Sequence, residues 1–279
     1  MIDAHTWLTG VLGYPVRHSL SPAMHNAAFQ SLGLNGVYLA FEVAPDRLAD
    51  AIQGMRGLKI RGLNLTIPHK EAVIPLLDGL TDAASRIGAV NTLFWDGDRL
   101  MGDNTDAEGF LRVLREGGVN PAHQTVLVLG AGGAARAVVY ALQTEGCTVI
   151  LANRSLDRAH ALAEAFGVGT VLPLERDALA PHAAQIHGVV NCTALGMTPN
   201  EASMPPLPLE ALPEACWVCD LVYRPLETRL LQAAKAHGLK TIDGLGMLAH
   251  QGALAFERWT GAPAPVSVMR DAALHALGL

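Results

Sequence analysis

Short apolar runs alternate along the chain with segments in which apolar residues recur every three or four positions. The first pattern indicates strands and the second indicates helices. Their alternation predicts an α/β fold with largely parallel sheets. In the first half we expect strands at 7–13, 36–43, 60–66, 90–95 and 99–102, and helices at 21–32, 45–55, 69–78 and 106–116.

The segment 117–125 divides this pattern in two. It reads GGVNPAHQT, and its glycines and proline interrupt the helical spacing ahead of a purely apolar run, as a domain junction does. The proline-rich segment 198–213 predicts an exposed loop. The second half has expected strands at 126–130, 148–152, 169–172, 187–191, 216–221 and 239–242, and expected C-terminal helices at 245–259 and 267–277.

We therefore expect two domains, with limits at 1–108 and 109–244. The C-terminal helices, within 245–279, are additions to the second domain and should pack back on the first. Half of the 279 residues are hydrophobic and 16% are charged, a composition typical of compact globular proteins.

Charge and the N-terminal sequence exclude several classes of partner. A formal net charge of −6 without a block of Lys or Arg argues against binding to nucleic acid or anionic lipid. The N-terminal MIDAHTW lacks the basic region of a signal peptide, and glycines and Arg136 interrupt the most apolar stretch. A cytoplasmic protein without a membrane span is the expectation.

The four cysteines form no recognisable site. Cys216 and Cys219 have C-x-x-C spacing, but a zinc site needs a second Cys or His pair and a redox motif needs a thioredoxin context. We expect reduced, mostly buried thiols and no metal site.

The run from Val126 onward carries a dinucleotide-binding turn. Four apolar residues are followed at once by G-x-G-x-x-A and an Ala-rich helix. In such a turn Gly130 permits the change of direction, Gly132 allows the backbone to approach a pyrophosphate, and Ala135 lets the helix pack on the strand. The N–H groups that begin the helix then face the phosphates.

The next strand indicates which nucleotide is bound. An NAD enzyme usually places an acid here for the ribose 2′-hydroxyl, whereas this chain has Asn153, Arg154 and Ser155, followed by Arg158. Guanidinium groups bind phosphate as a planar fork, so the sequence predicts NADP. The alternative is that the two arginines only cover the outer face of a helix start.

Four polar segments of the first half follow apolar runs, at the expected carboxyl ends of strands, where α/β sheets bind ligands. Singly, each has a plain structural explanation: Ser21 before Pro22 suits a helix N-terminus, and Lys70 could be a solvated surface residue. The segments are YPVRHSLSP at 14–22, NLTIPHK at 64–70, AVNT at 89–92 and GDNTDAEG at 102–109.

Together with the GAGGAAR turn, the NRS segment and the GLGMLAHQ run that ends at Gln251, these segments resemble the shikimate dehydrogenase family over most of the chain. The resemblance implies reversible, NADP-linked reduction of 3-dehydroshikimate to shikimate, a step toward chorismate and the aromatic amino acids. It also implies that 1–108 is a mostly parallel α/β substrate domain and that 109–244 is a Rossmann-type NADP domain.

The resemblance assigns roles residue by residue. Lys70 corresponds to the family's catalytic lysine and Asp106 to the carboxylate paired with it. The expected substrate-binding residues are Ser19, Ser21, Thr66, Asn91, Gln251 and Tyr223, besides Lys70 and Asp106. The expected cofactor-binding residues are Gly130, Ala131, Gly132, Gly133, Ala134, Asn153, Arg154, Ser155, Arg158, Leu221, Tyr223, Gly244 and, by a weaker match, Asp82.

The chemistry suits these residue types, because reducing a ketone requires a hydride from nicotinamide and a proton donor at the developing alkoxide. Whether Lys70 transfers that proton or chiefly stabilises the oxyanion stays open at this point. Two departures from the family pattern, Leu65 and His69, only flank the functional side chains. We expect His69 to serve packing or to lie on the surface.

Three alternative classes fit the sequence less well. A short-chain dehydrogenase needs Y-x-x-x-K, which none of the four tyrosines provides. A quinate/shikimate dehydrogenase, often NAD-linked, is disfavoured by the arginine pair. A nucleotide sensor that has lost its chemistry is disfavoured by the presence of both Lys70 and Asp106. The sequence leaves a monomer and a homodimer equally open.

Overall fold

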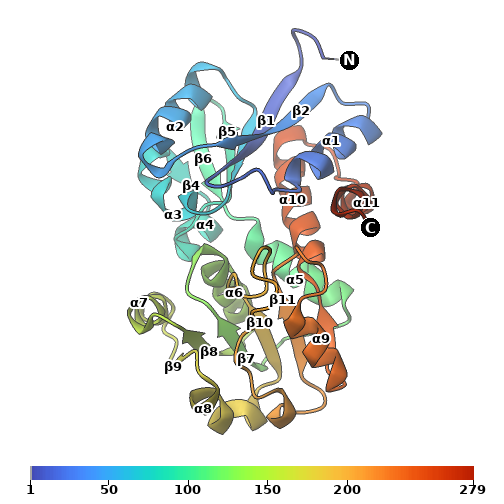
Figure 1. Cartoon of the computed structure of the whole chain (residues 1–279). Coiled ribbons are helices and arrows are strands. Elements are labelled where there is room, and N and C mark those ends of the chain that lie inside the picture. Colours follow the sequence, from blue (N-terminus) through green and yellow to red (C-terminus); the bar gives the residue numbers. More distant parts are fainter. Residues whose placement is uncertain (1) are drawn as a thin grey trace. The chain divides into compact units, whose positions relative to one another are not determined.

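The computed structural model describes residues 2–279, which form an α/β protein with two six-stranded sheets (Figure 1). Contacts within the chain divide it into two compact units. The first unit combines the residues up to Gly109 with Leu248–Leu279, and the second unit is Phe110–Met247. No helix within residues 2–279 is both long and apolar enough to cross a membrane.

The sheet of the first unit has the order β2-β1-β3-β5-β6-β4. Strand β1 lies parallel to both β2 and β3, whereas β5 runs antiparallel to β3 and β6. The antiparallel pairing of β5 with β6 follows from the tight turn between them, where Gly97 has a φ of +61° that suits a hairpin. The strands are β1 (Trp7–Gly13), β2 (Gly36–Glu42), β3 (Gly62–Leu65), β4 (Gly79–Leu80), β5 (Thr92–Asp96) and β6 (Arg99–Asp103).

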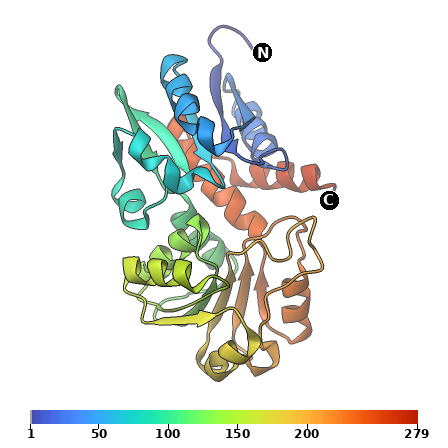
Figure 2. The same ribbon diagram turned by 60° about the vertical axis from the view of Figure 1, so that its left-hand side comes forward.

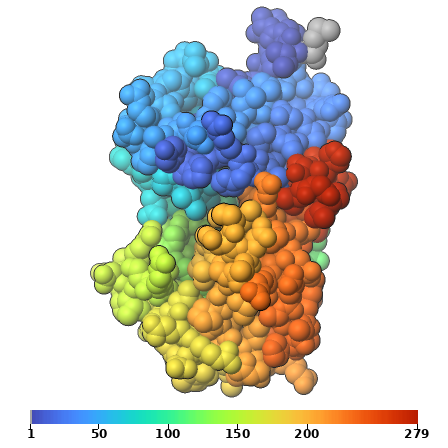
Figure 3. All heavy atoms as spheres, viewed as in Figure 1, coloured from blue at the N-terminus to red at the C-terminus, as the bar shows by residue number. Residues whose placement is uncertain are grey.

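Helices from both ends of the sequence pack in this unit. Helix α11 (Val266–Leu277) lies against α1 (Ser21–Ser31), as Figures 2 and 3 show where the red C-terminal residues meet the blue N-terminal ones. The prediction that the C-terminal helices return to the first part of the chain is therefore confirmed. The other helices are α2 (Leu48–Gly57), α3 (His69–Ala72) and α4 (Asp82–Ile87), while α5 (Asp106–Glu116) and α10 (Gly244–Thr260) each continue from one unit into the other.

The second unit contains an all-parallel sheet with the order β12-β11-β10-β7-β8-β9. This is the Rossmann order, in which the direction of winding reverses between β7 and β10. Its strands are β7 (Thr125–Leu129), β8 (Thr148–Asn153), β9 (Thr170–Pro173), β10 (Gly188–Asn191), β11 (Trp217–Asp220) and β12 (Lys240–Ile242), and its helices are α6 (Gly133–Thr144), α7 (Leu156–Phe166), α8 (Arg176–Leu179) and α9 (Arg229–Ala236).

Apolar side chains of these elements form a separate core in each unit. Leu63, Leu65 and Leu93 belong to the first core, and Leu127 and Val218 belong to the second. Because the central strands are covered on both faces, they contain few polar residues. The segment 198–213 is a loop with a single 3₁₀ turn at Leu209–Ala211, but the expectation that it is exposed is wrong. Its apolar side chains Leu207, Leu209 and Leu212 are buried in the core of the second unit.

The helix expected at 69–78 is wrong. Helix α3 ends at Ala72 and is followed by a 3₁₀ turn at Ile74–Leu76, because Pro75 lacks the N–H that a continuing α-helix needs. Strand β4 and helix α4 were not predicted. Both are shorter than the segments for which periodicity gives a signal.

Candidate active site

Two adjacent strands of the first sheet lead to the expected substrate residues. Strand β1 precedes Ser19 and Ser21, and its parallel neighbour β3 precedes Thr66. The ends of these two strands lie close together, since a Cβ at Gly13 would lie only 2.4 Å from Thr66 Cγ2. Ser19 Oγ accepts from the Ser21 N–H at 3.3 Å, where α1 begins without a side-chain cap. Two hydroxyls at the N-terminus of a helix, where the helix dipole favours negative charge, suit an anionic group.

Lys70 and Asp106 form an ion pair. Lys70 lies on α3 just beyond β3, and Asp106 begins α5 just beyond β6. The distance from Lys70 Nζ to Asp106 Oδ2 is 2.5 Å, and the side chains are 17% and 5% exposed. The Val90 N–H donates to the Lys70 carbonyl at 2.7 Å, which ties the lysine to the segment before β5. The structure thus brings together the two residues to which the sequence assigns the chemistry.

Asn91 connects this pair to the C-terminal part of the unit. Its Nδ2 donates to Asp106 Oδ1 at 2.8 Å and to Gln251 Oε1 at 3.3 Å. Asn91 is 1% exposed, and Gln251 lies on α10. Residues separated by 160 positions in sequence therefore share one cluster with Lys70.

Several buried polar residues of this cluster were missed by the sequence prediction. Tyr38, Asn64, Thr92 and Thr105 are each at most 6% exposed and are hydrogen-bonded to one another or to Asn91. The available signal was a polar residue inside an otherwise apolar strand, since Asn64 interrupts the buried strand β3. A buried polar residue of this kind needs hydrogen-bond partners, but the amino-acid sequence does not identify them.

His69 serves packing and does not lie on the surface. It is 1% exposed, and its Nε2 lies 2.8 Å from the carbonyl oxygen of Val43. Its ring therefore ties α3 to the end of β2, beside Lys70. No step of catalysis needs to be assigned to it.

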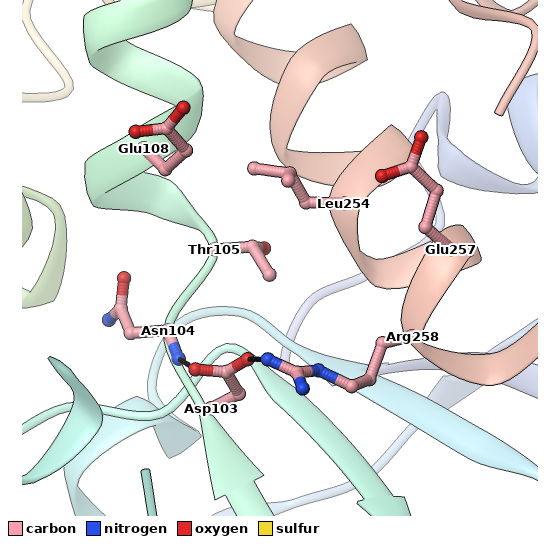
Figure 4. Close-up of a pocket in the computed structure, with 7 residues that line it drawn as sticks. All are labelled: Asp103, Asn104, Thr105, Glu108, Leu254, Glu257 and Arg258. Carbon is pink, nitrogen blue, oxygen red and sulfur yellow. Dashed lines mark hydrogen bonds and ion pairs between the residues drawn. The ribbon is translucent and has the colours of Figure 1, made fainter. Parts of the chain in front are cut away.

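A pocket of about 560 Å³ lies on the first unit between the start of α5 and α10 (Figure 4). Arg258 donates to Asp103 Oδ2 at 2.5 Å, and Glu108 and Glu257 project from the two helices. Three carboxylates against one guanidinium do not suit an anionic ligand, so we do not place the substrate carboxylate here. The lining residues are Asp103, Asn104, Thr105, Glu108, Leu254, Glu257 and Arg258.

The dinucleotide turn of the second unit has the expected geometry. Gly130 has a φ of +111°, and a Cβ there would lie 3.2 Å from the carbonyl carbon and oxygen of Cys192. A Cβ at Gly132 would meet no atom within 4 Å, and α6 begins at Gly133 without a side-chain cap. Ala135 is fully buried. An open backbone edge and free N–H groups at a helix start fit a pyrophosphate.

The expected 2′-phosphate residues lie at the end of β8 and the start of α7. Arg154 and Arg158 are exposed, and within residues 2–279 neither guanidinium contacts a carboxylate. The segment between them is held by Asn153, whose Nδ2 donates to the Ser155 carbonyl at 2.8 Å. Two unpaired guanidinium groups at the carboxyl end of this strand fit a phosphate monoester.

The expected nicotinamide residues lie after β11 and at the start of α10. Gly244 must be glycine, because a Cβ there would lie 2.5 Å from the carbonyl oxygen of Leu221. Burial raises the pKa of Tyr223. The preceding carboxylate, Asp220, is fully buried and accepts from Asn191, the Val222 N–H and Thr228.

Asp82 lies apart from these groups in sequence, in the first unit. It is an exposed residue in the first turn of α4. An acidic side chain there interacts favourably with the helix dipole, so its position has a structural explanation, and its link to the cofactor stays a prediction.

The cysteines are free thiols. Cys216 and Cys219 are buried, and Cys147 and Cys192 are partly exposed. Burial raises the pKa of Cys216 to about 12. Within the described residues no group of three or more His, Cys, Asp or Glu side chains could hold a metal ion.

Three family models match successive parts of the chain. The model described as shikimate dehydrogenase substrate binding domain matches residues 11–93. The model described as shikimate / quinate 5-dehydrogenase matches residues 115–198, and the model described as shikimate 5'-dehydrogenase C-terminal domain matches residues 244–274.

Relatives match over nearly the whole length. The shikimate dehydrogenase (NADP(+)) of Carboxydothermus hydrogenoformans is 49% identical over 97% of this chain and 98% of that protein. The crystal structure of shikimate 5-dehydrogenase from Thermus thermophilus in complex with NADP(H) and shikimate is 48% identical, with a TM-score of 0.88 over 97% of this chain and 99% of that chain. Quinate dehydrogenase from Corynebacterium glutamicum in complex with NAD is 36% identical, with a TM-score of 0.87 over 97% and 99%. The chain belongs to the shikimate dehydrogenase family.

Proposed function

We propose that this protein catalyses the reversible, NADP-linked reduction of 3-dehydroshikimate to shikimate. The observation that carries the proposal is the Lys70–Asp106 pair, joined at 2.5 Å beside Asn91 and Gln251. In this proposal these residues belong to a substrate-binding domain, 1–108 with 245–279, and a second domain, 109–244, binds NADP. NADPH, when bound, supplies the hydride.

Lys70 serves the oxygen of the reacting carbonyl. Both oxygens of Asp106 accept from donors, Oδ2 from Lys70 and Oδ1 from Asn91, so Asp106 acts as an ionised carboxylate that holds the lysine as an ammonium group. An ammonium N–H aimed at the developing alkoxide both stabilises its charge and can deliver its proton.

The remaining polar groups hold the substrate around that point. Ser19 and Ser21, at the start of α1, bind the carboxylate of the substrate, where the helix dipole favours negative charge. Thr66, Asn91 and Gln251 bind ring hydroxyls. Tyr223 is the second-unit residue that we assign to both substrate and cofactor.

For the cofactor, residues 130–134 bind the pyrophosphate and the segment Asn153–Arg158 binds the 2′-phosphate. Leu221 and Gly244 lie around the nicotinamide. Asp82 is a weaker assignment to the cofactor site. Because Arg154 and Arg158 have no carboxylate partner within residues 2–279, their charge is available to a phosphate.

Quinate oxidation with NAD is the alternative function, because the quinate dehydrogenase from Corynebacterium glutamicum in complex with NAD is also similar over 97% of this chain. The arginine pair favours NADP. Steady-state assays with shikimate and quinate, each with NADP⁺ and NAD⁺, separate the two functions: a higher kcat/KM for quinate with NAD⁺ would overturn the proposal.

We also propose that the enzyme works in the cytoplasm, as a monomer or a homodimer. Light scattering of the purified protein would distinguish these two states.

The role of Lys70 is tested by Lys70→Ala, with Lys235→Ala as the control, since Lys235 is an exposed lysine of α9. Loss of a positioned proton donor should lower kcat by about 10²–10⁴-fold. The dissociation constant for NADPH should not change, because Lys70 lies outside the cofactor-binding unit. A kcat near that of the Lys235→Ala control would refute the role.

A further inference from the structure

A buried line of hydrogen bonds runs from Tyr38 on β2 to the catalytic carboxylate. The Tyr38 hydroxyl lies 2.8 Å from Asn64 Oδ1, and Asn64 Nδ2 lies 3.1 Å from Thr92 Oγ1. Thr92 Oγ1 lies 2.9 Å from Asn91 Oδ1, and Asn91 Nδ2 lies 2.8 Å from Asp106 Oδ1. All five side chains are at most 6% exposed.

Backbone groups fix the direction of every hydrogen bond in this line. The Thr105 N–H can only donate, and it does so to Asn91 Oδ1 at 2.9 Å, so the Nδ2 of that amide must face Asp106. The Asn91 carbonyl can only accept, and it does so from Asn64 Nδ2 at 3.0 Å. Asn64 Oδ1 therefore faces Tyr38, whose hydroxyl must donate.

The hydroxyl of Thr92 joins the side-chain amides of Asn64 and Asn91. It accepts from Asn64 Nδ2 and donates to Asn91 Oδ1. Thr92 is fully buried and so cannot touch the substrate. Every donor along the line thus points toward the Asp106 carboxylate, and hydrogen bonds aligned in this way polarise one another where water is excluded.

We propose that Thr92 is a positioning residue for the reaction: its hydroxyl, held by Asn64 and Tyr38, orients the Asn91 amide so that Asp106 stays aligned with Lys70. The inference rests on the proposed function. It extends that function from the residues that meet the substrate to a second set, on β2, β3 and β5, that acts through Asn91.

Two substitutions of Thr92 separate the hydroxyl from the shape of the side chain. Thr92→Val keeps the shape and removes the donor, whereas Thr92→Ser keeps the donor. Losing one buried hydrogen bond of this kind should lower kcat about tenfold in Thr92→Val, with the KM for NADP⁺ unchanged, and Thr92→Ser should recover most of the loss.

Thr9→Val is the matched control. Thr9 is also fully buried in the same sheet, on β1, but its hydroxyl donates to the Val37 carbonyl at 2.9 Å and has no connection to Asp106. The substitution Thr9→Val should lower the melting temperature without lowering the kcat of the folded enzyme. An equal loss of kcat in Thr9→Val and Thr92→Val would overturn the proposal, since it would indicate only a general loss of packing.

Tyr38→Phe provides a second, independent test. It removes the donor at the far end of the line and should lower kcat by a smaller factor, about twofold to threefold. In the Thr92→Val background the same substitution should cause no further loss, because the line is already interrupted. Independent, multiplicative losses would refute the inference.

Failure of the inference differs from failure of the proposed function. If the unmodified protein does not oxidise shikimate with NADP⁺, the proposed function fails. If it does and Thr92→Val retains full kcat, only the positioning role of Thr92 fails.

Discussion

Replacing His25 with phenylalanine should make the protein less sensitive to acid. His25 lies on α1 and stacks on Tyr38, with ring centroids 4.2 Å apart and planes 3° from parallel. It is fully buried, and within residues 2–279 neither of its ring nitrogens has a hydrogen-bond partner. Burial therefore lowers the pKa of His25 from 6.5 to about 3, because an imidazolium would lose its hydration without gaining a partner.

The sign of the effect follows from the proton count. Below a pH of about 6.5 the unfolded chain binds a proton at this histidine, whereas the folded protein does not until the pH approaches 3. Stability is therefore lost as the pH falls through this interval. Each pH unit contributes about 1.4 kcal/mol, so the free energy of unfolding should fall by about 2 kcal/mol between neutral pH and about pH 5 from His25 alone.

Urea unfolding at about pH 7.5 and about pH 5 measures this contribution. For each protein the comparison is between its own two pH values, so any packing cost of the phenylalanine ring cancels. His25→Phe should lose about 2 kcal/mol less than the unmodified protein over this interval. His275→Gln, which changes an exposed histidine on α11, should leave the pH response as it is. An unchanged response in His25→Phe would refute the assignment of a neutral, buried imidazole.

Two further predictions concern the cofactor unit. Arg154→Asp should raise the KM for NADPH far more than that for NADH, by about tenfold to a hundredfold, because it replaces a phosphate-binding charge with a repelling one; equal changes in both KM values would contradict the NADP assignment. Gly130→Ala should lower the free energy of unfolding by at least about 1 kcal/mol, since alanine is strained at a φ of +111° and its Cβ would press on the Cys192 carbonyl. Urea unfolding of the variant checks this, and unchanged stability would contradict the strained turn.

The dinucleotide turn was predictable because its determinants are local. Strand β7, Gly130 and the start of α6 occupy consecutive positions, and each residue type is required by backbone geometry or by a nearby phosphate. The pairing of Lys70 with Asp106, in contrast, was predictable only from the family resemblance. Periodicity alone places both residues after strands and does not say that those strands are close in space.

The buried line through Tyr38, Asn64 and Thr92 could not be predicted. These residues lie on three strands, and their contact depends on the order β2-β1-β3-β5 and on the register between strands. A one-residue shift of register would turn their side chains to the other face. His69 illustrates the same limit, because only the path of the chain after β2 brings the Val43 carbonyl within 2.8 Å of its ring.

The discontinuity of the first unit has a consequence for synthesis on the ribosome. Its residues up to Gly109 emerge early, but Gln251 and α11 belong to the last part of the chain. The second unit, Phe110–Met247, is contiguous and can fold as soon as it has been translated. The half that holds Lys70 and Asp106 must instead wait, with the partner surface for α11 uncovered, until the final helices leave the exit tunnel. The nascent chain is therefore able to complete its nucleotide-binding half before the half that holds its catalytic pair.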